Sequence, residues 1–193
     1  MAQHRYHHGD LRRALLAAAT EAIEEKGPAA LSLRELARRA GVSHAAPAHH
    51  FGDKAGLLTA LAAEGFELLA AALHDAGDDF LEIGVAYVRF AVDHRAHFEV
   101  MFRPDLYRAD EETVAAARKQ ARDALFAGLA RFQAARPATA SGGDEDDTAA
   151  SGLAAWAIAH GFATLWLGGA LPAQLGDDPE AAARRVVGRL FDG

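Results

Sequence analysis

Apolar residues recur along this chain at spacings of three and four residues, and no stretch of useful length alternates between apolar and polar residues. The first spacing gathers side chains on one face of an α-helix, whereas a half-buried strand requires the second. Alanine, the strongest helix former, supplies about a quarter of the residues. The pattern therefore predicts an all-α protein.

Glycines, prolines and clusters of polar residues interrupt this pattern and divide the chain into predicted helices. We expect helices over Asp10–Lys26, Ser32–Gly41, Ser43–His49, Lys54–Gly77, Asp79–Arg95, Ala96–Arg103, Glu111–Ala135, Thr148–Leu171 and Pro179–Phe191. Between the last three helices we expect a mobile loop over Arg136–Asp147 and a turn over Pro172–Asp178.

Short polar side chains stand at the starts of the first four helices and are predicted to cap them. Asp10, Ser43 and Asp53 occupy these positions in the first, third and fourth helices. Ser32 opens the second helix, and Glu35 follows three residues later, which is the spacing of a capping box.

The second and third predicted helices form a helix-turn-helix. A three-residue turn joins them, and Gly41 within it can adopt the positive φ that such a turn needs. Val42 is expected to fill the junction between the two helices. Arg34, Arg38 and Arg39 give the second helix a basic outer side that suits a phosphate backbone. The third helix carries small and polar residues, so it can enter a major groove about 12 Å wide.

Charge is distributed unevenly along the chain, which carries −7 in total. Residues 1–56 hold eight Lys or Arg against six Asp or Glu, a net charge of +2, together with six of the ten His. Residues 57–193 hold twelve against twenty-one, a net charge of −9. This split favours a DNA-facing N-terminal part and a solvated remainder. The lack of Cys excludes a disulfide scaffold, a Cys-ligated metal and a thiol nucleophile.

The uncharged stretch Thr148–Gly176 is long enough to span a bilayer. It contains His160 and many Gly and Ala, and acidic residues flank both of its ends, so a positive-inside signal is missing. We interpret it as a helix buried in the core or at a subunit interface. Because no uninterrupted apolar region of a secretory signal follows the N-terminus, we expect a cytoplasmic protein with no membrane partner.

One part of the chain resembles a known family. The run Ser32–Ser43, followed by His50–Lys54 and then by Leu57 and Leu58, is similar to the DNA-binding domain of TetR-family transcriptional regulators. The likeness extends over about Leu11–Leu61.

A second likeness lies nearer the C-terminus. Trp156, His160 and Gly161 resemble the Trp-His-Gly motif of one TetR subfamily, and Asp93–Phe102 resembles the segment between its fifth and sixth helices. The family likeness implies a helix-turn-helix DNA-binding domain over residues 1–54, followed by a helical effector-binding and dimerisation domain over the rest, residues 55–193.

The resemblance also implies which residues touch DNA: Ser32, Arg34, Ser43, His44, His49 and Lys54. Lys54 would contact phosphate, the residues at the second helix would touch the backbone, and the residues around the third helix would face the groove. His50 and Phe51 would anchor the third helix against the first and fourth. The chain departs from the family at Ala48, where a Tyr that contacts phosphate is common.

A ligand pocket is predicted in the C-terminal domain. We assign to it Phe98, Met101, Phe102, Tyr107, Phe126, Trp156 and His160. The aromatic residues, with Phe162 and Trp166, serve equally well in an ordinary helical core, and a histidine such as His160 is often a hydrogen-bonded structural residue. The sequence leaves both interpretations open.

These features predict a sequence-specific DNA-binding regulator that forms a homodimer through its last two helices. We expect a repressor whose partners are double-stranded DNA, as a palindromic operator, and an unidentified small apolar effector. The alternatives are a regulator of the same fold that answers to a protein or to no effector, and a helical small-molecule-binding protein or enzyme. No nucleophile elbow, Walker loop, zinc-protease motif or Rossmann glycine pattern supports an enzyme. We expect no cofactor and no metal, because His44, His49 and His50 have no further ligand at a suitable spacing.

Overall fold

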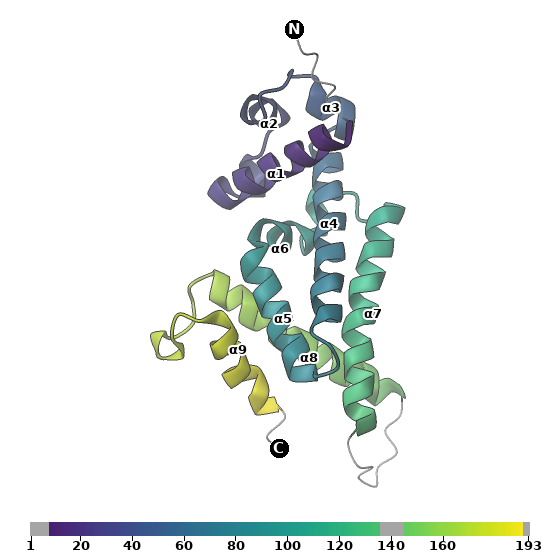
Figure 1. Ribbon diagram of the computed structural model, residues 1–193, viewed down its shortest axis with the longest axis vertical. Coiled ribbons are helices and arrows are strands. Elements are labelled where there is room, and N and C mark those ends of the chain that lie inside the picture. The colour runs from purple at the N-terminus through teal and green to yellow at the C-terminus, as the bar shows by residue number, and fades with distance from the viewer. Residues whose placement is uncertain (1–7, 136–144, 191–193) are drawn as a thin grey trace. The chain divides into compact units, whose positions relative to one another are not determined.

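The computed structural model describes residues 8–135 and 145–190, and every regular element within those ranges is helical (Figure 1). In chain order these elements, with η marking short 3₁₀ helices, are α1 (His8–Lys26), η1 (Pro28–Ala30), α2 (Leu33–Arg39), α3 (Ala46–Phe51), α4 (Lys54–Asp75), α5 (Phe80–Asp93), α6 (Arg95–Met101), η2 (Pro104–Leu106), α7 (Glu112–Ala135), α8 (Glu145–Leu167), η3 (Ala173–Leu175), α9 (Pro179–Val187) and η4 (Gly188–Leu190). The all-α prediction is confirmed.

Helix α1 begins earlier than its sequence pattern suggests. It starts at His8, so Asp10 lies inside the helix, and the prediction that Asp10 caps it is wrong. An acidic residue favours the first turn of a helix as well as its cap position, so sequence alone does not separate the two. Gly27, with a φ of 75°, follows the end of the helix as expected. One face of α1 is buried, at Leu15, Ala18, Ala19, Ala22 and Ile23.

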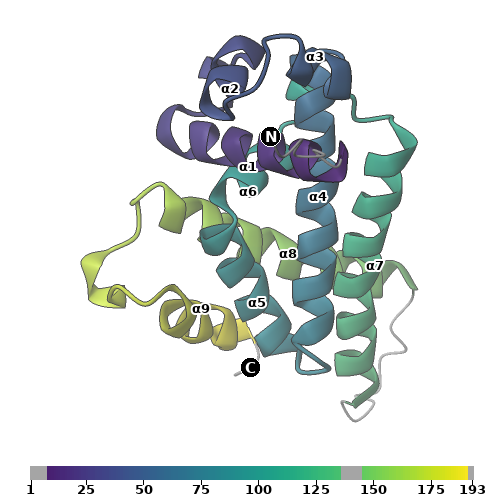
Figure 2. The ribbon, with the colours of Figure 1, turned by 45° about the horizontal axis from the view of Figure 1, so that its top comes forward.

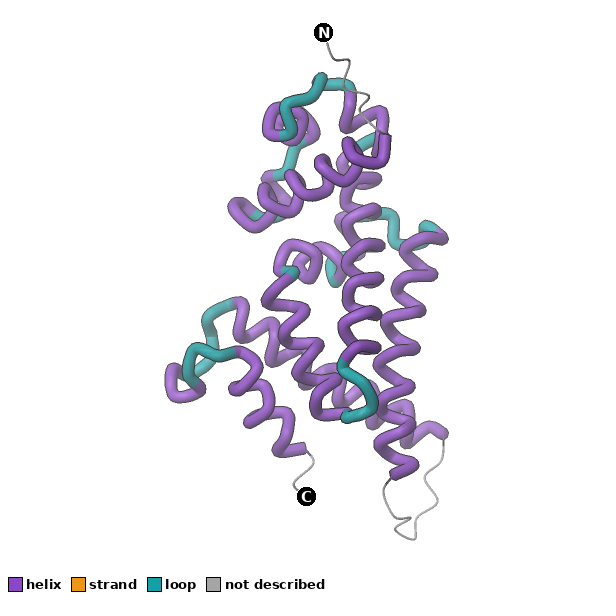
Figure 3. Tube along the Cα trace, viewed as in Figure 1, coloured by secondary structure: helices purple, strands orange, loops and turns teal. Residues whose placement is uncertain are grey.

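The connection between α2 and α3 is longer than the three residues predicted, and α3 begins later (Figure 3). Ser43 lies within this connection and does not cap the helix, because the cap position belongs to Ala45, which makes no side-chain cap hydrogen bond. Pro47 accounts for the shift. It lies in the first turn of α3, where its fixed φ is helical and its missing N–H is not needed.

Helix α8 begins earlier than predicted. Residues 145–147 are helical, which corrects the loop expected over Arg136–Asp147; residues 136–144 of that loop lie outside the described residues. Acidic residues in a first turn are favoured by the helix dipole, so the acidic run starts this helix rather than preceding it.

Helix α8 also ends earlier, at Leu167 instead of Leu171. Gly169 has a φ of 64°, its N–H bonds to the Trp166 carbonyl at 3.0 Å, and the Ala170 N–H bonds to the Leu165 carbonyl at 2.9 Å. This is a Schellman motif, which ends a helix wherever a glycine can take the left-handed conformation.

The ends of α5, α6 and α9 differ from the predictions by a few residues. Asp79 caps α5 by accepting hydrogen bonds from two backbone N–H groups, and α6 ends at Met101 instead of Arg103. Helix α9 ends at Val187 and continues as η4, while Phe191, the predicted end, lies outside the described residues.

The chain divides into two compact units. We call residues 1–65 with 96–115 the head unit, and residues 66–95 with 116–193 the body unit. Helix α4 contributes to both, and α6 belongs to the head unit except for its first residue. The domain boundary expected after residue 54 falls at the start of α4.

In the head unit, α1, α2 and α3 gather around the first turns of α4 (Figure 2). Their apolar faces form one core in which Leu36, Leu57 and Leu61 are fully buried. This core fixes the short α3 to helices that are long enough to be stable.

In the body unit, α5 lies between α8 and α9 and contacts both. Gly84 permits a close approach to α9, because a Cβ there would lie 3.2 Å from Val187. Arg184 of α9 binds the carboxylate of Glu82 on α5 through two hydrogen bonds of 2.9 and 2.7 Å. These contacts hold α9 against α5.

Candidate nucleic-acid interface

Helix α2 starts at the cap that the sequence predicts. Ser32 has an extended backbone, and its hydroxyl accepts a hydrogen bond from the Glu35 N–H at 3.3 Å. The predicted serine cap is confirmed. The Glu35 carboxylate does not turn back to the start of the helix as in a full capping box; it accepts hydrogen bonds from Arg38 and Arg39 instead.

Two of the three α2 arginines form ion pairs within the protein. Arg38 donates to the Glu35 carboxylate at 2.8 and 2.7 Å. Arg39 donates to Glu35 at 3.1 Å and to both oxygens of Glu25 on α1 at 2.9 and 2.6 Å. The hydrogen bonds from Arg38 and then Arg39 lower the pKa of Glu35 to about 2. The basic side of α2 is therefore narrower than predicted, and among the described residues Arg34 is the exposed α2 arginine that pairs with no acidic side chain.

The turn after α2 has the backbone that its glycine predicts. Gly41 has a φ of 65°, which confirms the expected positive value. Its N–H bonds to the Arg38 carbonyl at 3.3 Å, and the Val42 N–H bonds to the Ala37 carbonyl at 3.0 Å. Val42 is half-buried at the junction, so the turn is fixed both by hydrogen bonds and by packing.

Helix α3 presents one side to solvent and buries the other. His49 and Ala48 are exposed, whereas Pro47 and Phe51 are buried. The guanidinium of Arg12 on α1 lies 5.4 Å from the centre of the Phe51 ring, within cation–π range. Phe51 is thus anchored towards α1 as the resemblance implied.

The start of α4 carries the predicted cap and the predicted phosphate ligand. Asp53 Oδ1 accepts from the Gly56 N–H at 2.8 Å, which confirms the cap. Lys54 is half-buried, and its Nζ donates to the Ala29 carbonyl in η1 at 2.9 Å. An ammonium has three donors, so this bond leaves Lys54 able to bind an anion.

The six predicted DNA-contact residues all lie in the head unit. They are distributed over the start of α2, the connection after it, α3 and the start of α4. The exposed ones are Ser32, Arg34, Ser43, His44 and His49. Their positions leave polar and cationic groups available to a partner outside the chain.

Two family models match this chain. A model described as bacterial regulatory proteins of the tetR family matches residues 15–61, and a model of the tetracyclin repressor-like C-terminal domain matches residues 80–190. The second match alone spans more than half of the chain. The chain belongs to the TetR family of transcriptional regulators. It is accordingly a DNA-binding regulator with a helix-turn-helix.

Two solved structures share the fold over nearly the whole chain. A Rhodococcus sp. RHA1 protein of unknown function is 36% identical, with 98% of this chain and 97% of that one covered at a TM-score of 0.78. The TetR-family regulator PfmR from Thermus thermophilus is 23% identical over 93% of this chain and 97% of its own, at a TM-score of 0.70, and shows the shared fold.

Curated relatives match over a shorter stretch. The regulator BetI of Ectopseudomonas mendocina is 42% identical over 62 residues, which is 32% of either protein. The repressor Rv3405c of Mycobacterium tuberculosis is 42% identical over 52 residues, or 28% of its length. This TetR-family chain therefore covers about a third or less of these relatives.

The predicted ligand-pocket residues of the regulator are divided between its two units. Phe98, Met101, Phe102 and Tyr107 belong to the head unit, and Phe126, Trp156 and His160 belong to the body unit. In the head unit, the Phe98 and Phe102 rings lie 5.1 Å apart, and the Tyr107 hydroxyl donates to the Met101 carbonyl at 2.9 Å. These four residues already have partners within their own unit.

In the body unit, two of the predicted pocket residues share a partner that sequence reasoning missed. Trp156 Nε1 donates to the hydroxyl of Tyr87 on α5 at 3.2 Å, and this hydroxyl lies 2.9 Å from His160 Nδ1. An indole N–H can only donate, so the Tyr87 oxygen accepts from it, and the Tyr87 hydrogen is left able to bond to His160 Nδ1. Burial lowers the pKa of His160 and so favours the neutral imidazole, and the tautomer with its hydrogen on Nε2 lets Nδ1 accept from Tyr87.

The signal that could have identified Tyr87 is its position on the buried stripe of α5. Its exposed fraction is 1%, and a buried tyrosine hydroxyl requires a polar partner. Burial also raises the pKa of this phenol well above its usual range. Tyr87 therefore remains protonated and can direct its hydrogen to His160.

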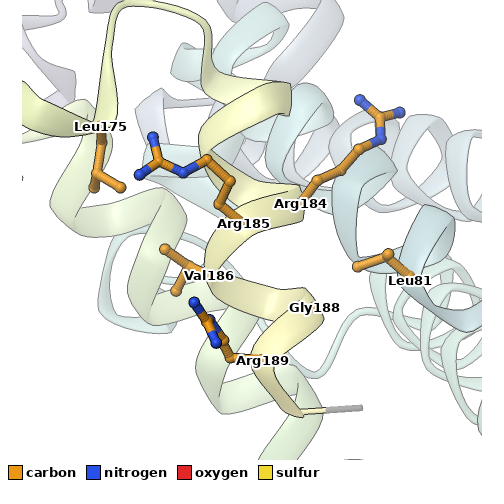
Figure 4. A pocket seen from close by; sticks show the side chains of 7 residues that line it. All are labelled: Leu81, Leu175, Arg184, Arg185, Val186, Gly188 and Arg189. Atoms are coloured by element: carbon orange, nitrogen blue, oxygen red, sulfur yellow. The ribbon is translucent and has the colours of Figure 1, made fainter. Parts of the chain in front are cut away.

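A groove of about 790 Å³ lies along α9 in the body unit (Figure 4). It is lined by Leu81, Leu175, Arg184, Arg185, Val186, Gly188 and Arg189. None of the predicted pocket residues is among them. In the part of the chain that the structure describes, no three His, Asp or Glu side chains gather as a metal site would require.

Proposed function

We propose that this TetR-family regulator is a repressor that a small apolar ligand releases from a palindromic operator. One observation carries the proposal: the exposed polar residues of α2, the connection and α3 lie in one compact unit with Lys54, as a surface for reading DNA requires. Regulators of this kind place a recognition helix in the major groove and cations on the flanking phosphates.

The proposed contacts divide by chemistry. Ser43, His44 and His49 face base edges, where short side chains and imidazole nitrogens form hydrogen bonds. Arg34 and Lys54 bind phosphate oxygens, and Ser32 adds a backbone contact at the start of α2. Lys54 exchanges its bond to the Ala29 carbonyl, or adds to it, when phosphate approaches.

We further propose a homodimer through α8 and α9. Two DNA half-sites one helical turn apart are bound by two head units, one from each copy of the chain. The supporting observation is the apolar surface of these helices. Leu153 and Leu165 on α8 are 55% and 47% exposed, and Val186 on α9 is 37% exposed. The apolar window Ala150–Leu167 is long enough to cross a membrane, yet it is only 22% buried, as a helix that packs against a second copy would be.

The proposed effector site is formed by predicted pocket residues of the body unit, around Trp156 and His160. An effector there acts by binding more tightly to the conformation that releases DNA, and a coupling of about 1–3 kcal/mol changes operator affinity about 5- to 150-fold. The proposal includes membership of the Trp-His-Gly subfamily, a cytoplasmic location and the absence of catalysis.

The test is a selection of duplexes from a random library with the purified full-length protein, followed by footprinting of the enriched sequence. We expect an inverted repeat with half-sites about 34–36 Å apart, protected by a dimer. An enriched sequence without two-fold symmetry, or no enrichment at low salt, contradicts the palindromic operator.

The effector is tested on the enriched duplex. A panel of small apolar compounds is screened by thermal shift, and each compound that raises the melting temperature is added to the protein–DNA complex. Release of the duplex supports the ligand-released repressor. Tighter binding of the duplex contradicts it and indicates a co-repressor.

A further inference from the structure

Arg108 lies in the segment between η2 and α7, yet it contacts the first two turns of α4 at two points. Its backbone N–H donates to Thr59 Oγ1 at 3.0 Å, and its guanidinium Nη2 donates to Asp53 Oδ2 at 2.9 Å. Asp53 stands 55 residues before it in the chain. A single residue thus spans from Asp53 to Thr59 along α4.

The Thr59 contact is the buried end of this span. Thr59 is 4% exposed, and its hydroxyl donates to the Ala55 carbonyl at 2.7 Å. Because the hydroxyl hydrogen is used within α4, the oxygen is left to accept from the Arg108 N–H. The backbone of Arg108 is therefore fixed to α4 independently of its side chain.

Gly56 lies between the two contacts. A Cβ at this position would clash with the Phe51 carbonyl oxygen and would lie 2.9 Å from Arg108 Nη1. A glycine inside a helix lowers helix stability, so its presence is explained by this close packing. The close backbone approach of Phe51 requires the glycine, and the Arg108 guanidinium lies beside the same position.

The Asp53 contact is the end nearest the DNA-binding surface. One carboxylate oxygen caps α4 through the Gly56 N–H, and the other accepts from Arg108. The Asp53 N–H itself bonds to the Phe51 carbonyl at 3.0 Å, at the end of α3. Arg108 therefore fixes Asp53, which lies between the end of α3 and the start of α4, next to Lys54.

The rest of the segment around Arg108 is built into the same unit. Residues 96–115 belong to the head unit, although the match to the tetR-family DNA-binding model ends at residue 61. His97 of α6 lies 3.3 Å from Glu64 of α4, and a Cβ on Gly65 would lie 3.0 Å from the His97 Cβ. Arg108 thus belongs to an element that packs along the head end of α4.

We propose that Arg108 is a positioning residue for DNA binding: it holds the α3–α4 junction so that Lys54 and α3 meet DNA together. The inference rests on the proposed contacts of α3 and Lys54. Arg108 itself is paired with Asp53 and adds no net cation to the surface. Their side chains are 49% and 61% exposed, and pairs this exposed contribute little to stability. Loss of Arg108 therefore changes DNA binding more than folding.

The experiment compares Arg108→Ala with Arg103→Ala. Arg103 is an exposed arginine that also belongs to residues 96–115 and lies 3.9 Å from Asp105. Binding is measured by fluorescence anisotropy over a range of KCl concentrations, with a duplex selected by the wild-type protein and with a random-sequence duplex. We expect Arg108→Ala to weaken binding to the selected duplex about tenfold and to the random duplex about twofold or less, with an unchanged salt slope. Arg103→Ala should leave the binding of both duplexes unchanged.

A double-mutant cycle distinguishes positioning from independent contributions. If Arg108 acts through the α4 start, Arg108→Ala combined with Lys54→Ala weakens binding less than the two separate losses predict. Arg108→Lys keeps the charge and the backbone N–H, and we expect its affinity for the selected duplex to lie between those of wild type and Arg108→Ala. This variant also keeps the inference testable if Arg108→Ala does not fold.

Three results would overturn the inference: a salt slope reduced by about one, which marks a direct phosphate contact, equal losses on both duplexes, or Arg108→Ala binding the selected duplex like Arg103→Ala. Failure of the wild-type protein to select any duplex would instead contradict the proposed function, so the two failures are distinguishable.

Discussion

Arg39 of α2 and Glu25 of α1 form a two-pronged ion pair, with nitrogen–oxygen distances of 2.9 and 2.6 Å. The sequence places Arg39 among cations available to DNA, but its side chain is only 17% exposed and is directed to α1. A cation that would have increased attraction to phosphate instead fixes the angle between two helices of the head unit.

The Arg39 cluster gives the first prediction, a dependence of stability on pH. The pKa of Glu35 is about 2 in the folded protein against an ordinary 4.5, and that of Glu25 is also lowered, by the hydrogen bonds from Arg39. A lowered carboxyl pKa adds stability that is fully present above about pH 4.5 and is lost as the pH falls towards about 2. As the pH is lowered between these limits, the free energy of unfolding measured in urea should therefore fall less for Glu35→Gln than for wild type. Parallel losses in the two proteins would contradict this assignment.

A second prediction concerns Lys54. Lys54→Ala should weaken binding to selected and random duplexes alike and reduce the salt slope by about one, because a phosphate contact carries no sequence information. Anisotropy titrations in KCl measure both effects. The control is Lys119→Ala on α7, an exposed lysine in the body unit, which should leave the slope unchanged. An unaltered slope for Lys54→Ala would remove Lys54 from the phosphate contacts.

A third prediction separates base reading from phosphate binding. His49 is exposed on α3, so His49→Ala should weaken binding to the selected duplex by about 1–3 kcal/mol and leave binding to random duplexes almost unchanged. Repeating the duplex selection with the variant should relax the preference at one position of each half-site. If the preferences stay identical, His49 does not read a base.

A fourth prediction tests the Tyr87 cluster. Tyr87→Phe removes the acceptor of the Trp156 N–H and the donor to His160, so the free energy of unfolding should fall by about 1–3 kcal/mol. Urea unfolding followed by circular dichroism measures this loss. The control is Tyr107→Phe, which removes a donor to the backbone carbonyl of Met101 and leaves no buried indole N–H without its acceptor, so its loss of stability should be smaller.

The same cluster makes stability depend on pH near neutrality. The pKa of His160 is lowered from 6.5 by burial, so the unfolded chain binds the proton more readily, and stability falls as the pH drops below about 6.5. His160→Asn keeps an acceptor near the Nδ1 position and does not titrate. Between about pH 7.5 and pH 5.5 its melting temperature should therefore fall less than that of wild type. An equally steep fall in the variant would assign the pH dependence to other groups.

Periodicity and local turn chemistry were sufficient to predict the helical class and most helix positions. Ser32, Asp53 and Gly41 act through neighbours within a few residues, so their roles are visible in sequence. The errors arise where two local signals compete. Helix α3 begins later than its polar cap signal at Ser43 predicts, because Pro47 lies in its first turn. Helix α8 ends before its apolar pattern does, because Gly169 takes a positive φ.

The remaining features depend on contacts between distant residues. Arg108 and Asp53 are 55 positions apart, and Tyr87 and His160 are 73 apart. No spacing in a single sequence reveals such pairs, because they are set by how helices pack. The interior partners of Trp156 and His160 were missed for this reason, although both residues were singled out.

The hydrogen bond between Trp156 and Tyr87 makes the fluorescence of the Trp156 indole sensitive to changes in the regulator's body unit. If His160 takes up a proton at Nδ1, that nitrogen becomes a donor, and the phenol can no longer direct its hydrogen there. This reorientation changes the electric field at the Trp156 indole. The intensity and wavelength of its fluorescence emission therefore report the protonation of His160, one helical turn away, without an attached dye.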